Sequence, residues 1–397
     1  MRHIFAIMIA ALFLFYPSHG FTVVKEIVAE GAYNMGDGET PSVAESRALL
    51  NAKRIALEQA GTYVESYTKV KNIQVTEDEI QVLASGIMEV EILDKKRTIV
   101  GDGFRFWVKI KATVNPDRIQ EMAKKVKEKS VIDDYKKIQE AYDKSQKEIE
   151  ELKKQLAQAK DKKEKKKVEA KISDDERMFQ ANEWFDKGYQ HYLNKEYDKA
   201  IEAYTSAIAI NPNYAKAHYN RGTVYGKEKG LHDKAIEDFN KAIALNPNLA
   251  EAYNNRGAAY GNKGQYDRAI EDYNKASTLN PNFAEAYNNR GIAYADKGHY
   301  DRAIEDSNKS IALDPNYAKA YYTRGLAYGK KGQYDRSIED FNKAIALNPN
   351  DAKAYAARGL AYAILGVIDR AISDLQKACD MGDENGCKGL KIALQSR

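Results

Sequence analysis

The two cysteines of the chain, Cys379 and Cys387, are the residues whose types and spacing most directly suggest chemistry. Along one continuous helix their Cα atoms would be about 12 Å apart, whereas a disulfide needs a separation of no more than ~7 Å. The intervening segment contains Gly382 and Gly386 among turn-forming residues, so we expect the chain to reverse there and bring the thiols together. The alternatives are two free thiols, or a metal site for which no histidine or third cysteine lies nearby in the sequence.

Outside this pair, the sequence contains no pattern that predicts catalysis or cofactor binding. It has no G-x-x-x-x-G-K-[ST] loop for phosphates, no H-E-x-x-H zinc motif and no C-x-x-C pair. The six histidines are scattered, and the GDG segments at 36–38 and 101–103 lack the lysine that a phosphate loop requires. We therefore expect a protein that is not an enzyme and that uses neither a metal ion nor a cofactor.

The composition is typical of a mainly α protein with several domains. The 397 residues are enough for two or three domains. The 27 tyrosines and only 8 prolines suit helices that pack through aromatic rings. Lysine and arginine (62) nearly balance aspartate and glutamate (58), which gives a net charge of +4. Because nucleic-acid binders usually carry a strongly basic face, this balance argues against nucleic acid as a partner.

The first twenty residues, MRHIFAIMIAALFLFYPSHG, have the pattern of a secretory signal peptide. A short basic start precedes the apolar run Ile4–Tyr16, and small residues lead to a cleavage site between Gly20 and Phe21. The run is shorter than a comfortable membrane span, although a retained anchor is the alternative. We expect the signal peptide 1–20 to be removed, which leaves an exported protein without a transmembrane span.

Residues 21–118 are expected to form a small α/β domain. The segment SVAESRALLNAKRIALEQAG predicts a helix with a capping box of Ser42 and Glu45 and a stop at Gly61. A second, shorter helix is predicted at 76–86. The segment IMEVEIL alternates like a strand, and RTIVGDGFRFWVKIKATV is typical of a hairpin. One face of this hairpin is apolar and consists of Phe106, Val108, Ile110, Ala112 and Val114.

This domain resembles the N-terminal domain of flagellar assembly protein T and related small envelope lipoproteins of Gram-negative bacteria. The resemblance rests on AESRALLNAKRIALEQAG, on ASGIMEVEIL, and on FRFWVKIKATV followed by Asn115 and Pro116. It implies a location in the bacterial periplasm or in association with the outer membrane. A lipid tether is not implied, because Phe21 rather than a cysteine follows the signal.

Residues 119–172 are expected to form a charged helical linker or coiled coil. Apolar and tyrosine side chains recur at intervals of four and three residues, the a and d spacing of a heptad, with charged residues between them. One interpretation is a solvated single helix that separates two domains. The other is a short coiled coil that forms a homodimer through 131–159. The seam consists of Val131, Tyr135, Ile138, Tyr142, Ser145, Ile149, Leu152, Leu156 and Ala159.

The C-terminal half of the chain repeats with a period of 34 residues. Prolines recur at intervals of 35, 34, 34 and 34 residues from Pro212 to Pro349, and the second repeat carries the one extra residue. The period, the small residue Gly257 and the aromatic residue Tyr253 together resemble the tetratricopeptide repeat, a helix pair that stacks into an α-solenoid. The resemblance covers 181–383, followed by a capping helix at 384–397. Six units begin near Ala181, Ala215, Ala250, Ala284, Ala318 and Ala352.

Two charged positions recur in these units and suggest an internal ion pair. Units two to six have arginine at position 7 and aspartate at position 23, whereas the first unit has Lys187 and Ala203 there. Because the two residues are present or absent together, we predict a salt bridge between the helices of each unit. The alternative is that both descend from one duplicated unit. The pairs are Arg221 and Asp238, Arg256 and Asp272, Arg290 and Asp306, Arg324 and Asp340, and Arg358 and Asp374.

The tetratricopeptide resemblance implies a protein or peptide partner on the concave face of the array. In such repeats first-helix positions 2, 5, 6, 9, 12 and 13 face this groove. There, amides can bond an extended backbone and tyrosine rings can cover apolar side chains. The alternative is a merely solvated inner face. A chaperone C-terminal carboxylate is not the expected partner, because no unit combines lysine at position 5 with asparagine at position 9. The candidates are Tyr219, Asn220, Lys227, Asn254, Asn255, Asn262, Asn288, Asn289, Lys319, Tyr322 and Lys330.

These expectations converge on an exported, non-enzymatic protein-binding scaffold. Two alternatives stay open: an assembly factor of an envelope appendage that acts through coiled-coil dimers, and a regulatory subunit of a periplasmic enzyme. The segment ACDMGDENGC also resembles the cysteine-paired turns of Sel1-like repeats, which have the same interval in exported proteins. This second resemblance implies a Cys379–Cys387 disulfide, which an oxidising compartment permits.

Overall fold

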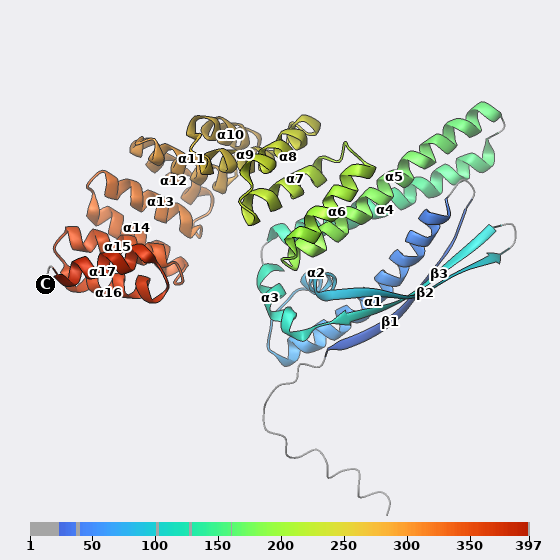
Figure 1. Cartoon of the computed structure of the whole chain (residues 1–397), viewed down its shortest axis with the longest axis horizontal. Helices are drawn as coiled ribbons and strands as arrows, with labels where there is room; N and C mark the ends of the chain where they lie inside the picture. Colours follow the sequence, from blue (N-terminus) through green and yellow to red (C-terminus); the bar gives the residue numbers. More distant parts are fainter. Residues whose placement is uncertain (1–23, 37–39, 101–102, 127–128, 160, 396–397) are drawn as a thin grey trace, which may run out of the picture. The chain divides into compact units, whose positions relative to one another are not determined.

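The computed structural model describes residues 24–36, 40–100, 103–126, 129–159 and 161–395 (Figure 1). The chain divides into two compact parts, one up to Glu196 and one from Tyr197 onward. The predicted signal peptide, with its cleavage site between Gly20 and Phe21, lies outside the described residues. Among the described residues, no helix combines the length and apolar character needed to cross a membrane.

The N-terminal part contains an antiparallel sheet of three strands in the order β1-β3-β2. The strands are β1 (Lys25–Asn34), β2 (Met88–Val100) and β3 (Gly103–Val114). The predicted strand and hairpin are confirmed by β2 and β3, and the predicted apolar face of β3, from Phe106 to Val114, is buried. Two residues of the predicted hairpin turn, Gly101 and Asp102, lie outside the described residues.

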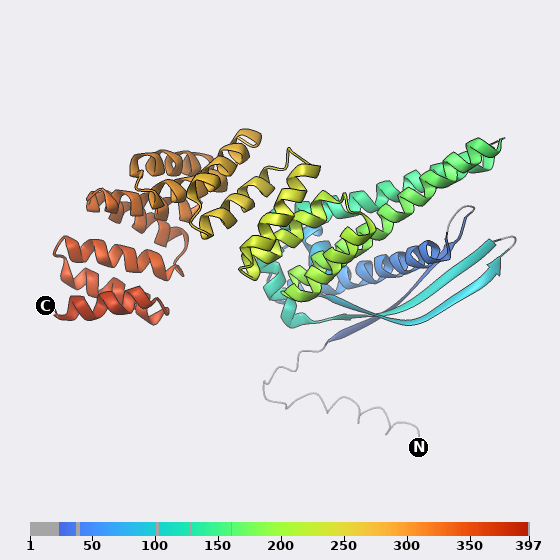
Figure 2. The same cartoon turned by 45° about the horizontal axis from the view of Figure 1, so that its top comes forward.

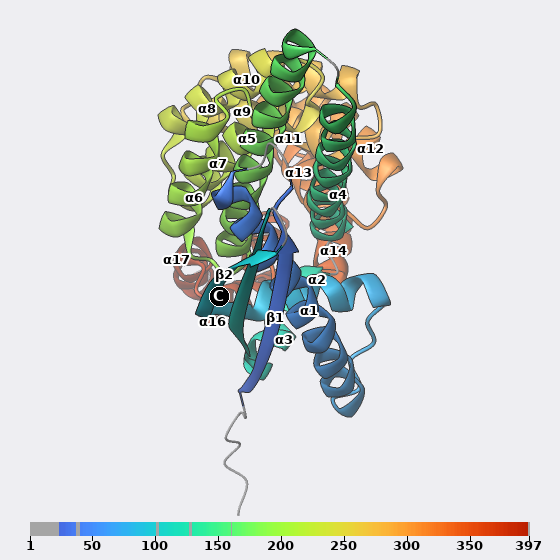
Figure 3. The same cartoon turned by 90° about the vertical axis from the view of Figure 1, so that its right-hand side faces the viewer.

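The strand β1 has no counterpart among the predicted elements, and its small residues explain why. Helix α1 (Pro41–Val70) lies along the inner face of the sheet (Figure 3). A Cβ atom at Gly31 of β1 would collide with the backbone of Ala48 and Ala52 in α1. Close approach of the helix therefore requires glycine at a strand position where the usual sequence signal would be a bulky β-branched residue.

Helix α1 begins and ends at different residues from those predicted. Its N-cap is Thr40, whose hydroxyl accepts a hydrogen bond from the backbone of Val43 at 3.4 Å. The predicted capping box of Ser42 and Glu45 is therefore wrong, because Pro41 is already the first helical residue. The helix continues through Gly61 to Val70. A capping box does occur at α2 (Glu77–Ile87), between Thr76 and Glu79.

The charged segment folds back on itself. Helix α3 (Pro116–Val126) precedes α4 (Lys129–Gln158) and α5 (Lys162–Leu193), and α4 and α5 pack side by side as a hairpin (Figures 1 and 2). Leu152 and Leu156 of the predicted seam form a buried cluster with Ile172 of α5. The C-terminal end of the seam is thus covered by the same chain, which corrects the expectation of a single solvated helix; the homodimer through 131–159 stays a prediction. The side chains of Val131, Tyr135, Ile138 and Tyr142 are outside the described residues.

No helix boundary separates the predicted linker from the predicted first repeat. Asp161 caps α5 by accepting hydrogen bonds from the backbone of Lys163 and Glu164, both at 2.8 Å. The helix then runs continuously through residue 172 to Leu193. The linker therefore ends inside a helix that also contains the start of the repeat region.

The C-terminal part consists of stacked helix pairs (Figure 2). First helices begin at the predicted residues Ala215, Ala250, Ala284, Ala318 and Ala352. The extra residue of the second repeat is accommodated by a π-helical turn at Val224–Glu228. The helices are α6 (Tyr197–Ile210), α7 (Ala215–Thr223), α8 (His232–Leu245), α9 (Ala250–Asn262), α10 (Tyr266–Leu279), α11 (Ala284–Asp296), α12 (Tyr300–Leu313), α13 (Ala318–Lys330), α14 (Tyr334–Leu347), α15 (Ala352–Ile364), α16 (Ile368–Asp380) and α17 (Glu384–Gln395).

The first helices of neighbouring repeats form the inner surface of this array. Contacts join α9 to α11, α11 to α13, α13 to α15 and α15 to α17, whereas successive second helices of residues 197–395 approach each other less closely. The array therefore curves toward its first helices. Small residues allow the tight packing within a repeat: a Cβ atom at Gly257 would lie 2.8 Å from the ring of Tyr273.

Candidate functional site

The predicted arginine–aspartate pairs are present in all five repeats and connect the two helices of each repeat. In the fourth repeat, Arg290 Nε donates to Asp306 Oδ2 at 2.8 Å and Nη2 donates to Oδ1 at 2.6 Å. The carboxylate is buried, and its hydrogen bonds with the guanidinium raise the pKa of Arg290. The same geometry occurs in the pairs Arg221–Asp238, Arg256–Asp272, Arg324–Asp340 and Arg358–Asp374.

Each arginine also binds the preceding repeat, a contact that the sequence interpretation did not include. Arg290 Nη1 donates to Asn274 Oδ1 on the second helix of the third repeat at 2.6 Å. The equivalent acceptors are Thr205, Asn240, Asn308 and Asn342. The recurrence of asparagine at position 25 was a signal for this contact. Because every nitrogen of the guanidinium bonds within the array, these arginines stabilise the fold rather than face a partner.

The asparagines predicted to grip a partner are largely buried between first helices. Asn254 and Asn288 are each 1% exposed and Asn255 is 6% exposed. Asn255 Nδ2 donates to the hydroxyl of Tyr219 at 3.1 Å, and Asn289 Nδ2 donates to Asn254 Oδ1 at 3.0 Å. The expected exposure of these amides is therefore wrong, since positions 5 and 6 face the neighbouring first helix.

This row of amides stops at Asn288. Within the described part of the chain, neither amide atom of Asn288 has a hydrogen-bond partner, although both are buried. The next repeat has Thr323 at position 6, where the third and fourth repeats have Asn255 and Asn289. The shorter threonine forms no hydrogen bond with Asn288. The side-chain hydrogen bonds that connect the first helices of the earlier repeats are therefore missing between the fourth and fifth repeats.

The remaining candidates stay accessible to different degrees. Asn262, Lys319, Lys330 and Lys227 are exposed. Tyr219, Asn220, Asn289 and Tyr322 are half-buried, and burial raises the pKa of Tyr322 to about 12. The sequence interpretation missed a set of exposed aliphatic side chains at position 9 of the first helices and of the capping helix, Ile292, Leu326, Leu360 and Ile392.

Family comparisons agree with this architecture. A family model described as TPR repeat matches residues 188–229, 227–264, 262–298 and 293–332, and two models described as Tetratricopeptide repeat match 318–351 and 352–381. Residues 188–381 belong to the tetratricopeptide-repeat family. The matches begin at residue 188, so the resemblance of residues 21–118 to the flagellar assembly protein T domain stays a prediction.

Several solved structures are similar to the chain. The APC/C hetero-tetramer Cut9–Hcn1 has 22% identity and a TM-score of 0.50 over 54% of this chain and 42% of that one, so the match spans less than half of the relative. MamA has 32% identity and a TM-score of 0.38 over 44% of this chain and 94% of that one. The pilF protein of Pseudomonas aeruginosa has 19% identity and a TM-score of 0.47, over 53% and 97% of the two chains. The comparison with curated proteins gives no match.

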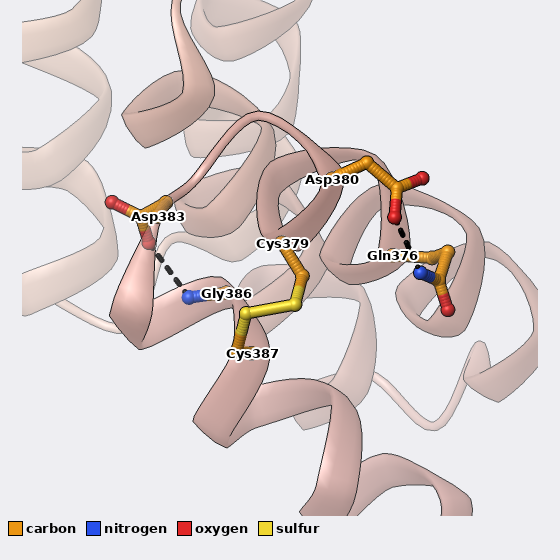
Figure 4. The surroundings of a disulfide bond; sticks show 6 residues. All are labelled: Gln376, Cys379, Asp380, Asp383, Gly386 and Cys387. Atoms are coloured by element: carbon orange, nitrogen blue, oxygen red, sulfur yellow. Dashed lines mark hydrogen bonds between the residues drawn. A yellow bond between two sulfur atoms is a disulfide. The ribbon is translucent and has the colours of Figure 1, made fainter.

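The predicted disulfide joins Cys379 and Cys387 at the C-terminal end of the tetratricopeptide array (Figure 4). Their Cα atoms are 4.6 Å apart, because Gly382 (φ 87°) reverses the chain between α16 and α17. Asp383 accepts a hydrogen bond from the backbone of Gly386 at 2.6 Å and so fixes the start of α17. On the last turns of α16, Gln376 donates to Asp380 at 2.7 Å. The bond therefore holds the capping helix against the sixth repeat.

The N-terminal part contains a surface hollow of about 710 Å³ beside α1, β2 and α5. Its lysines are paired with acidic side chains: Lys95 with Glu45, Lys96 with Asp94 at 3.1 Å, and Lys187 with Glu183 at 3.3 Å. Arg97 also lines the hollow, and its guanidinium lies 4.8 Å from the centre of the Phe104 ring. Among the described residues, no group of three or more His, Cys, Asp or Glu side chains is placed to hold a metal ion.

Proposed function

We propose that this protein is a non-enzymatic scaffold that binds a protein or peptide on the inner surface of its tetratricopeptide array. The observation that carries the proposal is a contrast between two sets of positions on the same helices. Position 7 is arginine in repeats two to six, and it bonds inside the array each time. Positions 2, 9 and 13 face the solvent of the groove to different degrees, and their residue types change from repeat to repeat. A surface of this kind is expected where a partner, rather than the fold, determines the side chain.

We further propose that the protein is exported to the periplasm or associates with the outer membrane. Two observations support this. The first twenty residues have a basic start, an apolar run and small residues before Phe21, which is the pattern of a cleaved signal peptide. The Cys379–Cys387 disulfide favours an oxidising compartment. The envelope resemblance of residues 21–118 agrees with both.

An assembly function through coiled-coil dimers is the alternative. The C-terminal end of the seam packs Leu152 and Leu156 against Ile172 of the same chain. A dimer through these two residues would require α4 and α5 to separate there first. The scaffold proposal needs no such rearrangement, because its binding surface is exposed in the single chain.

Site-specific photo-crosslinking in cells that produce the protein tests the scaffold proposal. A photo-reactive residue replaces Lys319 or Lys330 on the inner surface, or Lys343 on the second helix α14 as the control; all three are exposed. We expect discrete protein adducts from Lys319 and Lys330 and none from Lys343. Adducts from Lys343 alone, or from none of the three positions, would contradict binding on the inner surface.

A further inference from the structure

Four aliphatic side chains form a row on the inner surface, at intervals of 34, 34 and 32 residues. They are Ile292, Leu326, Leu360 and Ile392, with exposed fractions of 42%, 39%, 44% and 65%. Each lies at position 9 of its helix, on α11, α13, α15 and α17 respectively, and these helices contact one another in that order. The row therefore crosses four neighbouring helices without interruption.

The row ends toward the N-terminal repeats. At the same position the third repeat has Ala258 and the second has Thr223. The hydroxyl of Thr223 is already engaged, since it donates to the carbonyl of Tyr219 at 2.9 Å. The apolar surface is thus confined to repeats four to six and the capping helix, which defines one segment of the groove.

Lysines flank the row on two of its four helices. On α13, Lys319 and Lys330 lie seven residues before and four residues after Leu326, so all three side chains fall within about 40° of one another around the helix. On α15, Lys353 precedes Leu360 at the same interval. The three lysines are exposed, and within residues 197–395 none of them forms an ion pair.

The other charges on these helices do not cancel the lysines. Helices α13 and α15 contain no acidic residue. Their arginines, Arg324 and Arg358, are neutralised by Asp340 and Asp374. Helix α11 differs, because Glu285 and Asp296 occupy the positions that correspond to Lys319 and Lys330. The surface charge therefore changes sign between α11 and α13, the first two helices of the aliphatic row.

We propose that repeats four to six and the capping helix bind an extended polypeptide segment that is both aliphatic and acidic. Its aliphatic side chains pack on Ile292, Leu326, Leu360 and Ile392. Its carboxylates pair with Lys319, Lys330 and Lys353. This inference rests on the proposed scaffold function and names the chemistry of the partner. An aliphatic row between lysines suits such a segment better than nucleic acid, whose bases bind aromatic rings.

The charge pattern also sets the direction of the bound segment. Because α11 is acidic at the two flanking positions, the end of the segment that crosses α11 carries a basic or neutral side chain. The end that crosses α13 and α15 carries the carboxylates. The leader sequence of the chain itself, residues 1–20, contains no acidic residue and does not fit this description.

Selection from a random peptide library displayed on phage, with the full chain as bait, tests the partner chemistry. We expect the enriched peptides to combine at least two aliphatic residues with Asp or Glu and to be poor in Lys and Arg. Enrichment of basic peptides, or of acidic peptides without aliphatic residues, would overturn this inference and leave the scaffold function standing. If no peptide is enriched, both proposals fail.

The selected consensus peptide, labelled with fluorescein, then locates the site by anisotropy. Replacing Leu326 and Leu360 with serine should weaken binding by about tenfold or more, since each removes roughly half of a leucine contact. The double substitution Lys319→Glu and Lys353→Glu should weaken peptide binding by at least as much. It should also make the peptide affinity less dependent on salt concentration. Lys343→Glu on α14 is the matched control and should leave the affinity unchanged.

Two results would overturn the assignment. In the first, both pairs of inner-surface substitutions preserve the affinity while circular dichroism shows an intact array. In the second, sedimentation shows that the chain forms a dimer that the serine substitutions abolish, because a second copy rather than an acidic segment would then cover the row. The lysine variants keep the test valid if the serine variants prove unstable, since the lysines are exposed and unpaired within residues 197–395.

Discussion

The guanidinium group of Arg290 donates two hydrogen bonds to the carboxylate of Asp306, at 2.8 and 2.6 Å, and a third to Asn274 of the preceding repeat at 2.6 Å. One side chain thus joins both helices of its own repeat and the second helix of the repeat before it. The same polar contacts therefore recur from repeat to repeat, as the apolar packing does.

A double-mutant cycle on this pair should be strongly non-additive. Either Arg290→Ala or Asp306→Ala leaves a buried, uncompensated charge, which costs on the order of 3 kcal/mol. The double variant should recover at least about 1 kcal/mol of the summed loss in the free energy of unfolding, measured with urea. The exposed pair Lys297 and Asp267 is the control, with a coupling below about 1 kcal/mol. Additive losses for Arg290 and Asp306 would show that the pair is not a stabilising unit.

Thr323→Asn should stabilise the array. Asparagine at this position in the third and fourth repeats bonds to the preceding first helix, and here it would reach the unpartnered amide of Asn288. We expect a gain of about 0.5–1.5 kcal/mol in the free energy of unfolding. The same substitution in an Asn288→Ala background should give no gain. An equal gain in both backgrounds would exclude the proposed hydrogen bond as its cause.

Asn254→Ala should destabilise the fold. The substitution removes the acceptor of the Asn289 hydrogen bond from a site that is 1% exposed, so we expect a loss of about 1–3 kcal/mol. Asn262→Ala, at the exposed end of the same helix, should change the thermal midpoint very little. Unchanged stability of the Asn254 variant would indicate that the buried amides contribute to something other than the fold.

Acid titration should protonate Asp306 before Asp238. Burial raises the pKa of Asp306 above its ordinary value. Burial also acts on Asp238, but hydrogen bonds from Arg221 and His218 outweigh it and lower the pKa of Asp238. Ionised Asp238 therefore stabilises the folded state above its unfolded pKa, and this contribution is lost as the pH falls through its folded pKa. For Asp306 the sign is reversed, because its folded pKa lies above the unfolded one, so the folded state gains stability as the pH falls through it.

Carbon-13 NMR of the side-chain carboxyl groups measures this order directly. His218→Tyr, the residue that the next four repeats have at this position, should raise the pKa of Asp238 toward that of Asp306. A titration in which Asp238 protonates first, or in which His218→Tyr has no effect, would show that the histidine does not set the difference.

Reduction of the Cys379–Cys387 disulfide should loosen the end of the array. The closed loop is short, so we expect a loss of about 2–3 kcal/mol. Hydrogen exchange should become faster in α17 and the end of α16, with no change in α9 or α11. A variant with both cysteines replaced by serine is the control and should not respond to reductant. Two reactive thiols in the denatured, unreduced protein would show that the bond is absent.

The elements that the sequence predicts well are those whose own period determines their contacts. The 34-residue period places the starts of the first helices of repeats two to six correctly, and the alternation in β3 identifies its buried face. The seam of α4 is also periodic, but its period could not reveal which helix covers it. The reversal before Lys162 contains neither glycine nor proline, and Asp161 is one acidic residue in a highly charged segment.

In the candidate site, too, the sequence could not reveal which neighbouring helix covers a given side chain. Positions 5 and 6 of a first helix lie near its inner face, which is why the asparagines were predicted to be exposed. Their burial follows from the closeness of the next first helix, as the hydrogen bond from Asn289 to Asn254 shows. The aliphatic row had a signal in the sequence, because Ile292, Leu326 and Leu360 recur every 34 residues. It was not interpreted because no single leucine or isoleucine on a helix is unusual.

The contact from each arginine to the preceding repeat gives the array a direction in which it can lengthen. A duplicated unit inserted before α15 would find an acceptor on its N-terminal side and supply one on its C-terminal side. The end of the chain offers no such continuation. Gln376, at the acceptor position of the sixth repeat, bonds to Asp380 of its own helix, and α17 has Leu390 at position 7, where an arginine would be needed. Gene duplication can therefore change the number of internal repeats while the terminal pair, closed by its disulfide, is inherited unchanged.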